Sequence, residues 1–184
     1  MKKVALLGDS IRQIGYGLKV PELLGKDYEV FQPEDNCRFV KYTLRMLFDF
    51  KDSLKDCDVI HWNNGLWDIC RLFGDSKTFT SEVEYFDNMI RVAKILKDIT
   101  PNVVFATTTP VRKENPYNRN EDIDRFNALI VPELQKMGFE INDLNGLIRD
   151  DIEKYICDDL IHLTEAGKDI CAKQVARYIK AFGA

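Results

Sequence analysis

Histidine is scarce in this chain, which has only His61 and His162 among its 184 residues. The five cysteines form an odd number and show no C-x-x-C spacing: Cys37, Cys57, Cys70, Cys157 and Cys171. Structural zinc sites use closely spaced cysteine pairs together with histidines, and disulfide frameworks use even sets, so neither is indicated. We therefore expect reduced thiols, as in a cytoplasmic protein.

Long apolar runs are also missing. A membrane-spanning helix takes about 20 apolar residues, and no segment approaches that length. The N-terminal apolar run, residues 4–7, ends at Gly8-Asp9 and is shorter than the core of about seven residues that a signal peptide needs. The net charge is -4, with 30 acidic and 26 basic residues and no basic stripe. We expect a cytoplasmic protein that binds neither membranes nor nucleic acid.

No tract rich in glycine, serine or proline divides the chain, and no internal repeat is visible. A chain of 184 residues suits one compact domain that buries roughly 70% of its unfolded surface. Apolar residues make up 45% of the chain, which is enough for a packed core. We predict a single domain over residues 1–184, whose oligomeric state the sequence leaves open.

Strand and helix patterns alternate along the chain. Short apolar segments predict five strands, over residues 3–7, 28–31, 58–62, 103–107 and 140–144. Amphipathic patterns predict helices over 42–54, 81–99, 122–137 (with a kink at Pro132) and 164–179 (with Thr164 as N-cap). This alternation predicts an α/β fold: a three-layer α/β/α sandwich of flavodoxin-like type, built on a five-stranded, mainly parallel sheet.

Polar residues follow several of the predicted strands. The carboxyl ends of parallel strands meet at one edge of a sheet, where ligands collect. The loops expected at that edge carry Ser10, Asn63-Asn64, residues 107–110 and His162. We therefore expect these four segments to share one rim of the sheet.

Ser10 and His162 are a candidate pair for nucleophilic catalysis. A serine hydroxyl attacks a carbonyl efficiently only when a neighbouring base takes its proton, and imidazole is the usual base. Asp159 lies three residues before His162, where its carboxylate can orient the ring and stabilise the imidazolium. Ser10 could instead serve only as a helix N-cap, and His162 only as a surface residue.

Two segments resemble sequence blocks of the SGNH, or GDSL-type, hydrolase superfamily. Residues 8–11, Gly-Asp-Ser-Ile, resemble its nucleophile block, and residues 159–167, Asp-Leu-Ile-His-Leu-Thr-Glu-Ala-Gly, resemble its D-x-x-H block. The resemblance implies a serine esterase that works through an acyl-enzyme, with Ser10 as nucleophile, His162 as base and Asp159 as its partner. It implies no cofactor or metal. The implied substrate is a small-molecule or carbohydrate ester with a short acyl group, most simply acetyl.

The two middle blocks match less well. The family places an asparagine after the third strand as an oxyanion donor, and here we predict Asn64 for that role, with Asn63 as the alternative. Both could instead form a turn, since Asn-Gly favours turns. The family's second-block glycine falls at Lys41, so the donor there is either the N–H of Lys41 or a rebuilt loop over residues 36–38. The N–H of Ser10 is the remaining predicted donor.

Several residues near these segments are candidates for substrate binding: Tyr16, Arg38, Asn63 and Trp67. Aromatic faces with scattered polar groups suit a sugar ring or a small acyl group. We expect residues 107–120 to shape the rim of the site or to form a plain solvated connection. His61 lies within an apolar run, where a buried structural ring is expected, and Asp9 is expected to cap the loop beside Ser10.

Two alternatives to an active esterase remain. One is a non-catalytic flavodoxin-like binding domain, and the other is a degenerate member of the same superfamily. Residues 8–13 lack a glycine-rich phosphate loop, and the third strand ends in Trp62-Asn63-Asn64 rather than in a phosphoacceptor aspartate. Both observations count against the binding-domain alternative.

Overall fold

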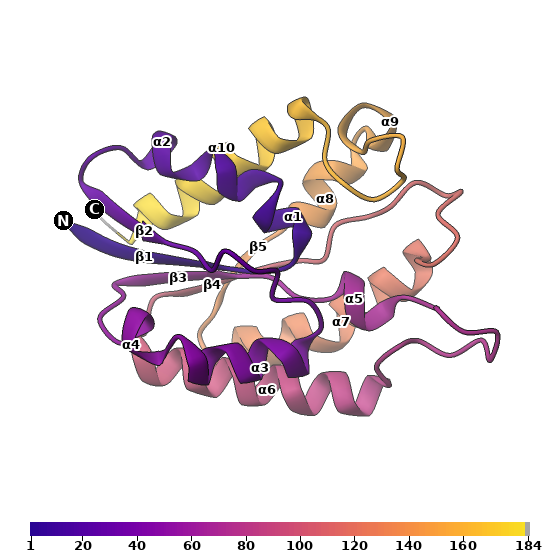
Figure 1. Ribbon diagram of the computed structural model, residues 1–184, viewed down its shortest axis with the longest axis horizontal. Helices are drawn as coiled ribbons and strands as arrows, with labels where there is room; N and C mark the ends of the chain where they lie inside the picture. Colours follow the sequence, from indigo (N-terminus) through magenta and orange to yellow (C-terminus); the bar gives the residue numbers. More distant parts are fainter. Residues whose placement is uncertain (183–184) are drawn as a thin grey trace.

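The protein is built on one parallel sheet. A computed structural model describes residues 1–182, and Figure 1 shows the sheet between two layers of helices. The strand order is β2-β1-β3-β4-β5 and every neighbouring pair is parallel. The strands are β1 (Lys2–Leu7), β2 (Tyr28–Phe31), β3 (Val59–Trp62), β4 (Val103–Ala106) and β5 (Glu140–Asn142). The predicted three-layer sandwich is confirmed.

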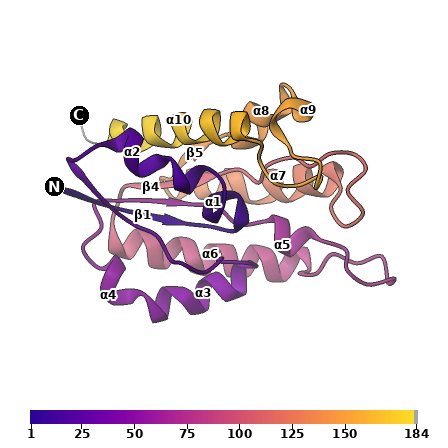
Figure 2. The ribbon, with the colours of Figure 1, turned by 45° about the horizontal axis from the view of Figure 1, so that its top comes forward.

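The helices divide between the two faces of the sheet, as Figures 1 and 2 show. One layer holds α1 (Ser10–Gln13), η1 (Tyr16–Leu18), α2 (Val20–Leu24), α8 (Leu144–Arg149), α9 (Ile152–Tyr155) and α10 (Glu165–Ala181). In this layer the long helix α10 packs against η1 and α2. The other layer holds α3 (Val40–Asp49), α4 (Lys51–Leu54), α5 (Leu66–Ile69), α6 (Glu82–Ile99) and α7 (Asn120–Lys136).

The long helices agree with the sequence pattern, with one exception. The predicted helix over residues 42–54 is two helices, α3 and α4, which meet at Phe50. Pro132 lies inside α7, and Thr164 caps α10 by accepting a hydrogen bond from the N–H of Gly167. The helices that sequence periodicity missed have three to six residues each, too few for an amphipathic repeat to show.

The central strands are buried on both faces, which explains their continuous apolar sequences. Val4 to Leu7 in β1, all of β3 and all of β4 are buried. In the register of the sheet, Leu7 pairs with Trp62 and Trp62 with Phe105, so these three strands end together. The polar segments that follow them begin at the same edge.

Residues 1–182 include all five cysteines. All five cysteines are unpaired, and four of them are buried. Among the helices of this described part, none has the length and apolar composition that crossing a bilayer requires.

Candidate active site

A tight turn between β1 and α1 presents Ser10. Asp9 is the N-cap of α1, where its Oδ1 accepts a hydrogen bond from the N–H of Ile11 at 3.0 Å. This confirms the capping role expected for Asp9. The preceding residue, Gly8, is held by Cys37, whose N–H donates to the Gly8 carbonyl and whose Sγ accepts from the Gly8 N–H. A side chain at position 8 would collide with the carboxamide of Asn63, so only glycine fits.

Ser10, His162 and Asp159 form one hydrogen-bonded line. Ser10 Oγ lies 2.9 Å from His162 Nε2, and His162 Nδ1 lies 2.7 Å from Asp159 Oδ2. The two segments from opposite ends of the chain therefore meet, as the sequence led us to expect. The distances are within hydrogen-bond reach for a nucleophile, a base and the group that orients the base.

Asp159 is held in its charged form. Burial raises the pKa of its carboxyl, but hydrogen bonds from the backbone and ring of His162 and from the N–H of Ile161 outweigh burial, so the pKa lies below its ordinary value. A carboxylate in this place fixes the tautomer and the orientation of the imidazole.

Backbone hydrogen bonds to residues 156–157 hold the loop that carries His162. The carbonyl of His162 accepts from the N–H of Cys157 at 2.7 Å, and Ile156 and Leu163 form an antiparallel bridge. Leu160 adopts a left-handed backbone conformation with φ of +72°. His162 follows the last strand, as expected, with α8 and α9 between β5 and this loop.

The structure does not support the prediction that Asn64 donates to an oxyanion. Asn64 is fully buried, and both ends of its carboxamide are engaged. Its Oδ1 accepts from Thr43 Oγ1 and Trp62 Nε1, and its Nδ2 donates to the carbonyl of Arg38. Asn64 therefore joins α3, β3 and the loop before α3, and none of its surface is exposed.

Asn63 and Tyr16 are also part of the interior. Asn63 is 5% exposed; its Nδ2 donates to Asp9 Oδ1 at 2.9 Å and its Oδ1 accepts from the Tyr16 hydroxyl at 2.8 Å. Tyr16 is completely buried, so the prediction that it binds substrate is wrong. The substrate-binding prediction for Asn63 fails for the same reason, because its carboxamide holds the Asp9 cap in place.

His61 has the structural role expected for it. The ring is fully buried in β3, with the Tyr16 hydroxyl 3.5 Å from Nδ1 and Asn142 Nδ2 3.1 Å from Nε2. Burial lowers the pKa of His61 to about 3, so the ring is neutral. His61 therefore takes no part in proton transfer.

The loop before α3 lies against the nucleophile turn through Cys37. Arg38 has a left-handed backbone with φ of +48°, a conformation that favours glycine, and its N–H donates to Asn36 Oδ1. Its half-exposed side chain lies over the ring of Tyr42 and pairs with Asp35. Lys41, by contrast, lies in α3 along a groove shared with α6. Of the two alternatives for this block, the rebuilt loop over residues 36–38 is the one beside Ser10.

The N–H of Ser10 is free to bind a ligand atom. Among residues 1–182 it has no hydrogen-bond acceptor, and it stands at the first position of α1. Unpaired donors at a helix start favour a developing negative charge.

A cavity of about 180 Å³ opens beside Ser10. Its walls come from α5, from the loops after α5 and before α7, and from the loop of His162: Leu66, Trp67, Cys70, Leu72, Tyr117, Asn118 and Ile161. Trp67 was predicted to contact substrate, and the structure places it in this wall with 39% of its surface exposed. The other wall residues were missed. Only Ile161 carried a signal, its position inside the D-x-x-H block.

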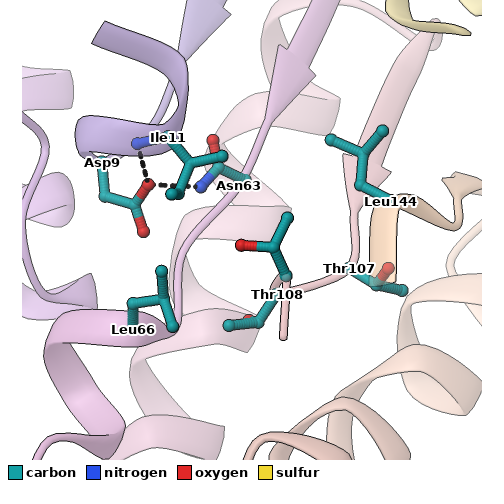
Figure 3. A pocket seen from close by; sticks show the side chains of 8 residues that line it. Asp9, Ile11, Asn63, Leu66, Thr107, Thr108 and Leu144 are labelled. Carbon is teal, nitrogen blue, oxygen red and sulfur yellow. Dashed lines mark hydrogen bonds between the residues drawn. The ribbon is translucent and has the colours of Figure 1, made fainter. Parts of the chain in front are cut away.

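A second hollow, below the turn, is closed. Figure 3 shows Asp9, Asn63, Leu66, Thr107 and Thr108 around it, and it has no room for a water molecule. Thr107, Thr108 and Thr109 are buried, so the expectation of a rim or solvated loop is wrong for these three residues. Thr107 Oγ1 donates to Asp143, and the Thr108 backbone pairs with Asn127.

Sequence comparison finds no relatives: no protein-family model matches the chain, and no curated protein matches it. Solved structures do match. A lipase/acylhydrolase from Enterococcus faecalis superposes with a TM-score of 0.78 at 17% identity, covering 98% of this chain and 96% of that one. An acetyl xylan esterase gives 0.79 at 18% identity, covering 96% and 99%. The fold is that of GDSL-type lipases and acetyl xylan esterases.

An acetylxylan esterase from Geobacillus stearothermophilus extends this likeness, with a TM-score of 0.77 at 16% identity over 97% of this chain and 94% of that one. The shared fold covers nearly the whole chain in each case. Identity this low establishes architecture, and the chemistry must be argued from the residues themselves.

Proposed function

We propose that this chain is a serine esterase of the SGNH, or GDSL-type, superfamily, with Ser10 as nucleophile, His162 as general base and Asp159 as the residue that orients His162. The observation that carries the proposal is the unbroken line from Ser10 Oγ to His162 Nε2 at 2.9 Å and from His162 Nδ1 to Asp159 Oδ2 at 2.7 Å. These groups in this order are what acyl transfer by an alcohol requires.

The proposed reaction has two halves. Ser10 Oγ attacks the ester carbonyl while His162 Nε2 takes the hydroxyl proton, and the Asp159 carboxylate stabilises the imidazolium. The N–H of Ser10 donates to the oxyanion of the tetrahedral intermediate. His162 then gives the proton to the departing alcohol, leaving an acyl-enzyme on Ser10. Water then attacks the acyl-enzyme and loses a proton to His162, which passes it to Ser10 Oγ as the carboxylic acid leaves.

For the substrate we propose an ester of a short acyl group on a small molecule or carbohydrate. Two of the three proteins compared above are acetyl xylan esterases, which makes an acetylated sugar the first substrate to test. Trp67 supports this choice, since it presents a partly exposed aromatic face, with 39% of its surface exposed, at the mouth of the site. Such faces pack against the C–H side of a sugar ring.

The first test is hydrolysis of p-nitrophenyl acetate by wild type, Ser10→Ala and a matched control, Ser53→Ala. Ser53 is an exposed serine in α4. We expect Ser10→Ala to lower kcat by about a thousandfold or more, and Ser53→Ala to match wild type. Folding is checked by circular dichroism and thermal unfolding.

A folded wild-type protein that hydrolyses no ester in a panel of acetyl, butanoyl and hexanoyl esters would sink the proposal. That outcome would favour the non-catalytic or degenerate alternatives that the sequence leaves open.

A further inference from the structure

The cavity beside Ser10 is mostly apolar, and two of its polar residues, Asn118 and Cys70, already make hydrogen bonds within the protein. Asn118 is 4% exposed, and its Nδ2 donates to the carbonyl of Leu66. Burial raises the pKa of Cys70 to about 11, so its thiol is neutral, and its Sγ donates to the carbonyl of Trp67. Hydroxyl groups of a sugar would lose water here and gain few hydrogen-bond partners, which is unfavourable. The cavity therefore suits a hydrocarbon group.

The cavity is also larger than an acetyl group requires. Its volume of about 180 Å³ compares with the apolar cavity of about 150 Å³ that accommodates benzene in another protein. A group of about six carbons fits that space. An acetyl group has two carbons and would leave most of the cavity empty.

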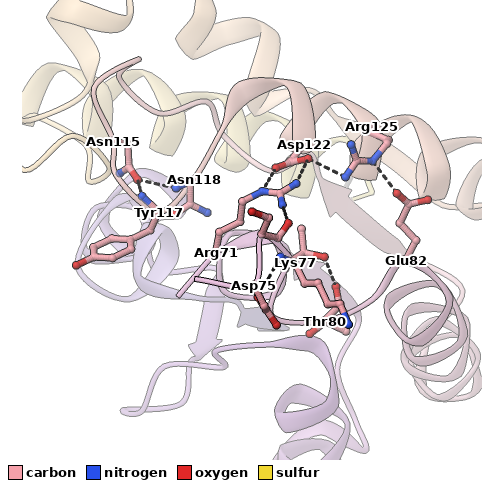
Figure 4. Close-up of polar contacts among 12 residues, drawn as sticks. Arg71, Asp75, Lys77, Thr80, Glu82, Asn115, Tyr117, Asn118, Asp122 and Arg125 are labelled. Atoms are coloured by element: carbon pink, nitrogen blue, oxygen red, sulfur yellow. Dashed lines mark hydrogen bonds and ion pairs between the residues drawn. The ribbon is translucent and has the colours of Figure 1, made fainter. Parts of the chain in front are cut away.

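The walls of the cavity are anchored to each other, as Figure 4 shows. The N–H of Arg71 donates to the carbonyl of Tyr117 at 2.8 Å, which joins the loop after α5 to the loop before α7. The Arg71 guanidinium makes two hydrogen bonds to Asp122, at 2.8 and 3.0 Å, and Asp122 also pairs with Arg125. The Asp122 side chain is only 4% exposed, so its charge-assisted hydrogen bonds to Arg71 and Arg125 are strong. The cavity is therefore preformed.

The position of the cavity relative to Ser10 and His162 indicates where the acyl group and the alcohol of an ester would lie. Ser10 belongs to the cavity wall, and the acyl group is the part that stays bonded to Ser10 Oγ after the alcohol leaves. The alcohol must receive its proton from His162, which is not among the wall residues within 1–182 and whose side chain is 30% exposed. The alcohol side therefore faces the open rim.

We propose that this cavity is the acyl pocket of the enzyme, and that it selects acyl groups of about four to six carbons over acetyl. The inference rests on the proposed esterase function and concerns the substrate of that same site. A sugar or other polar alcohol would then lie at the rim, outside the cavity, with Leu72 and Tyr117 lining the acyl chain.

The test is kcat/KM for p-nitrophenyl esters from acetate to octanoate, because a constant alcohol isolates the acyl group. A fully buried methylene is worth about fourfold. Because the cavity is open on one side, the four added methylenes of hexanoate are only partly buried. We therefore expect kcat/KM to rise at least tenfold in total from acetate to hexanoate and not to rise further at octanoate. A rate that is highest for acetate would overturn the inference.

Variants of the wall residues test whether the cavity causes the acyl-chain preference. Leu72→Ala and Tyr117→Ala remove parts of the wall, and each should lower the hexanoate-to-acetate ratio about fivefold or more. Phe73→Ala is the matched control: it lies in the same loop, is 68% exposed and is not a wall residue, so the ratio should stay at the wild-type value. Because Leu72 and Tyr117 are 47% and 53% exposed, their removal should leave folding intact.

The outcomes separate this inference from the proposed function. Absence of hydrolysis with every ester removes the esterase function, and with it the pocket. Activity with a ratio that neither wall variant changes overturns the pocket alone. A second series varies the alcohol with acetate held constant: if Leu72→Ala alters the alcohol preference and leaves the acyl ratio unchanged, the cavity holds the alcohol and the acyl assignment is wrong.

Discussion

Asp159 and His162 show how a local sequence block produces a catalytic geometry. The carboxylate of Asp159 accepts the N–H groups of Ile161 and His162 with one oxygen and the His162 ring with the other. The same aspartate therefore builds the turn and orients the base. This double role explains why the D-x-x-H spacing by itself indicates an oriented histidine.

Asp159→Asn tests the orienting role. Asparagine keeps the size of the side chain but removes the charge that stabilises the imidazolium, and it favours the wrong ring tautomer. We expect kcat for p-nitrophenyl esters to fall by about a hundredfold or more, with unchanged circular dichroism. Asp158→Asn, at the neighbouring exposed aspartate, is the control and should retain full activity. Equal rates for the two variants would contradict the role given to Asp159.

Asp68 was not singled out by sequence, and it is the buried acid that links two loops of the site. It is fully buried in α5, where it accepts hydrogen bonds from the N–H of Val40 and from Thr80 Oγ1. Burial raises the pKa of Asp68 to about 7, although these hydrogen bonds oppose the rise. The folded protein therefore holds a proton that the unfolded chain releases at a much lower pH.

The pH dependence of stability follows from this shift. The Asp68 carboxyl ionises near pH ~4 in the unfolded chain and near pH ~7 in the folded protein. Between these two values the folded state binds more protons than the unfolded state. Asp68 therefore makes the free energy of unfolding fall as the pH rises through this range. Asp68→Asn cannot ionise. We expect the stability of wild type relative to Asp68→Asn to decrease by up to a few kcal/mol over this range and to be constant on either side of it. Urea unfolding at several pH values measures it, and a difference that stays constant from pH 4 to 8 would refute the assignment.

The oxyanion asparagine shows where residue-level prediction failed. Asn63 and Asn64 follow a strand and precede glycine, which made both suitable donors by sequence. Their actual partners, Thr43, Trp62, Tyr16 and Asp9, come from distant parts of the chain. Sequence spacing does not show which polar side chains a fold will bury and satisfy, and burial decided against both.

At the scale of single elements, the turn between β1 and α1 depends on Gly8. A methyl group at this position would push Asn63 and Asp9 away from the start of α1. We expect Gly8→Ala to lower the free energy of unfolding by about 1–3 kcal/mol and kcat/KM by tenfold or more, since small displacements of a nucleophile are costly.

Gly74→Ala is the matched control for this substitution. Gly74 has no atom within 4 Å of an added Cβ. Its variant should match wild type in denaturant unfolding and in ester hydrolysis. If Gly8→Ala behaves like Gly74→Ala, the account of the turn is wrong.

Elements with strong periodicity were predictable, and short ones were not. The four long helical segments and all five strands appear in the structure within a few residues of their expected bounds, apart from the break at Phe50. Short helices such as α5 and α8 carry one turn or little more, and tertiary contacts determine them. Because α5 and the loop after it form much of the cavity, the shape of the substrate pocket was the part least visible in sequence.

At the scale of the whole molecule, the parallel sheet is what joins the two ends of the chain. β1 is an interior strand between β2 and β3, and α10 packs against η1 and α2, so the segment before α10 reaches the turn after β1. Ser10 and His162 are 152 positions apart in sequence and 2.9 Å apart in space. Alternation of strands and helices predicted this meeting, because parallel strands bring their carboxyl ends to one edge.

The most direct test of the esterase proposal is labelling by a fluorophosphonate probe, followed by mass spectrometry of the tryptic peptide that spans residues 4–12. An activated serine reacts with such a probe, whereas an ordinary surface serine does not. We predict one probe per wild-type molecule, attached to Ser10, and no labelling of folded Ser10→Ala or His162→Ala. A folded wild-type protein that stays unlabelled, or a Ser10→Ala variant that labels equally well, would contradict the account.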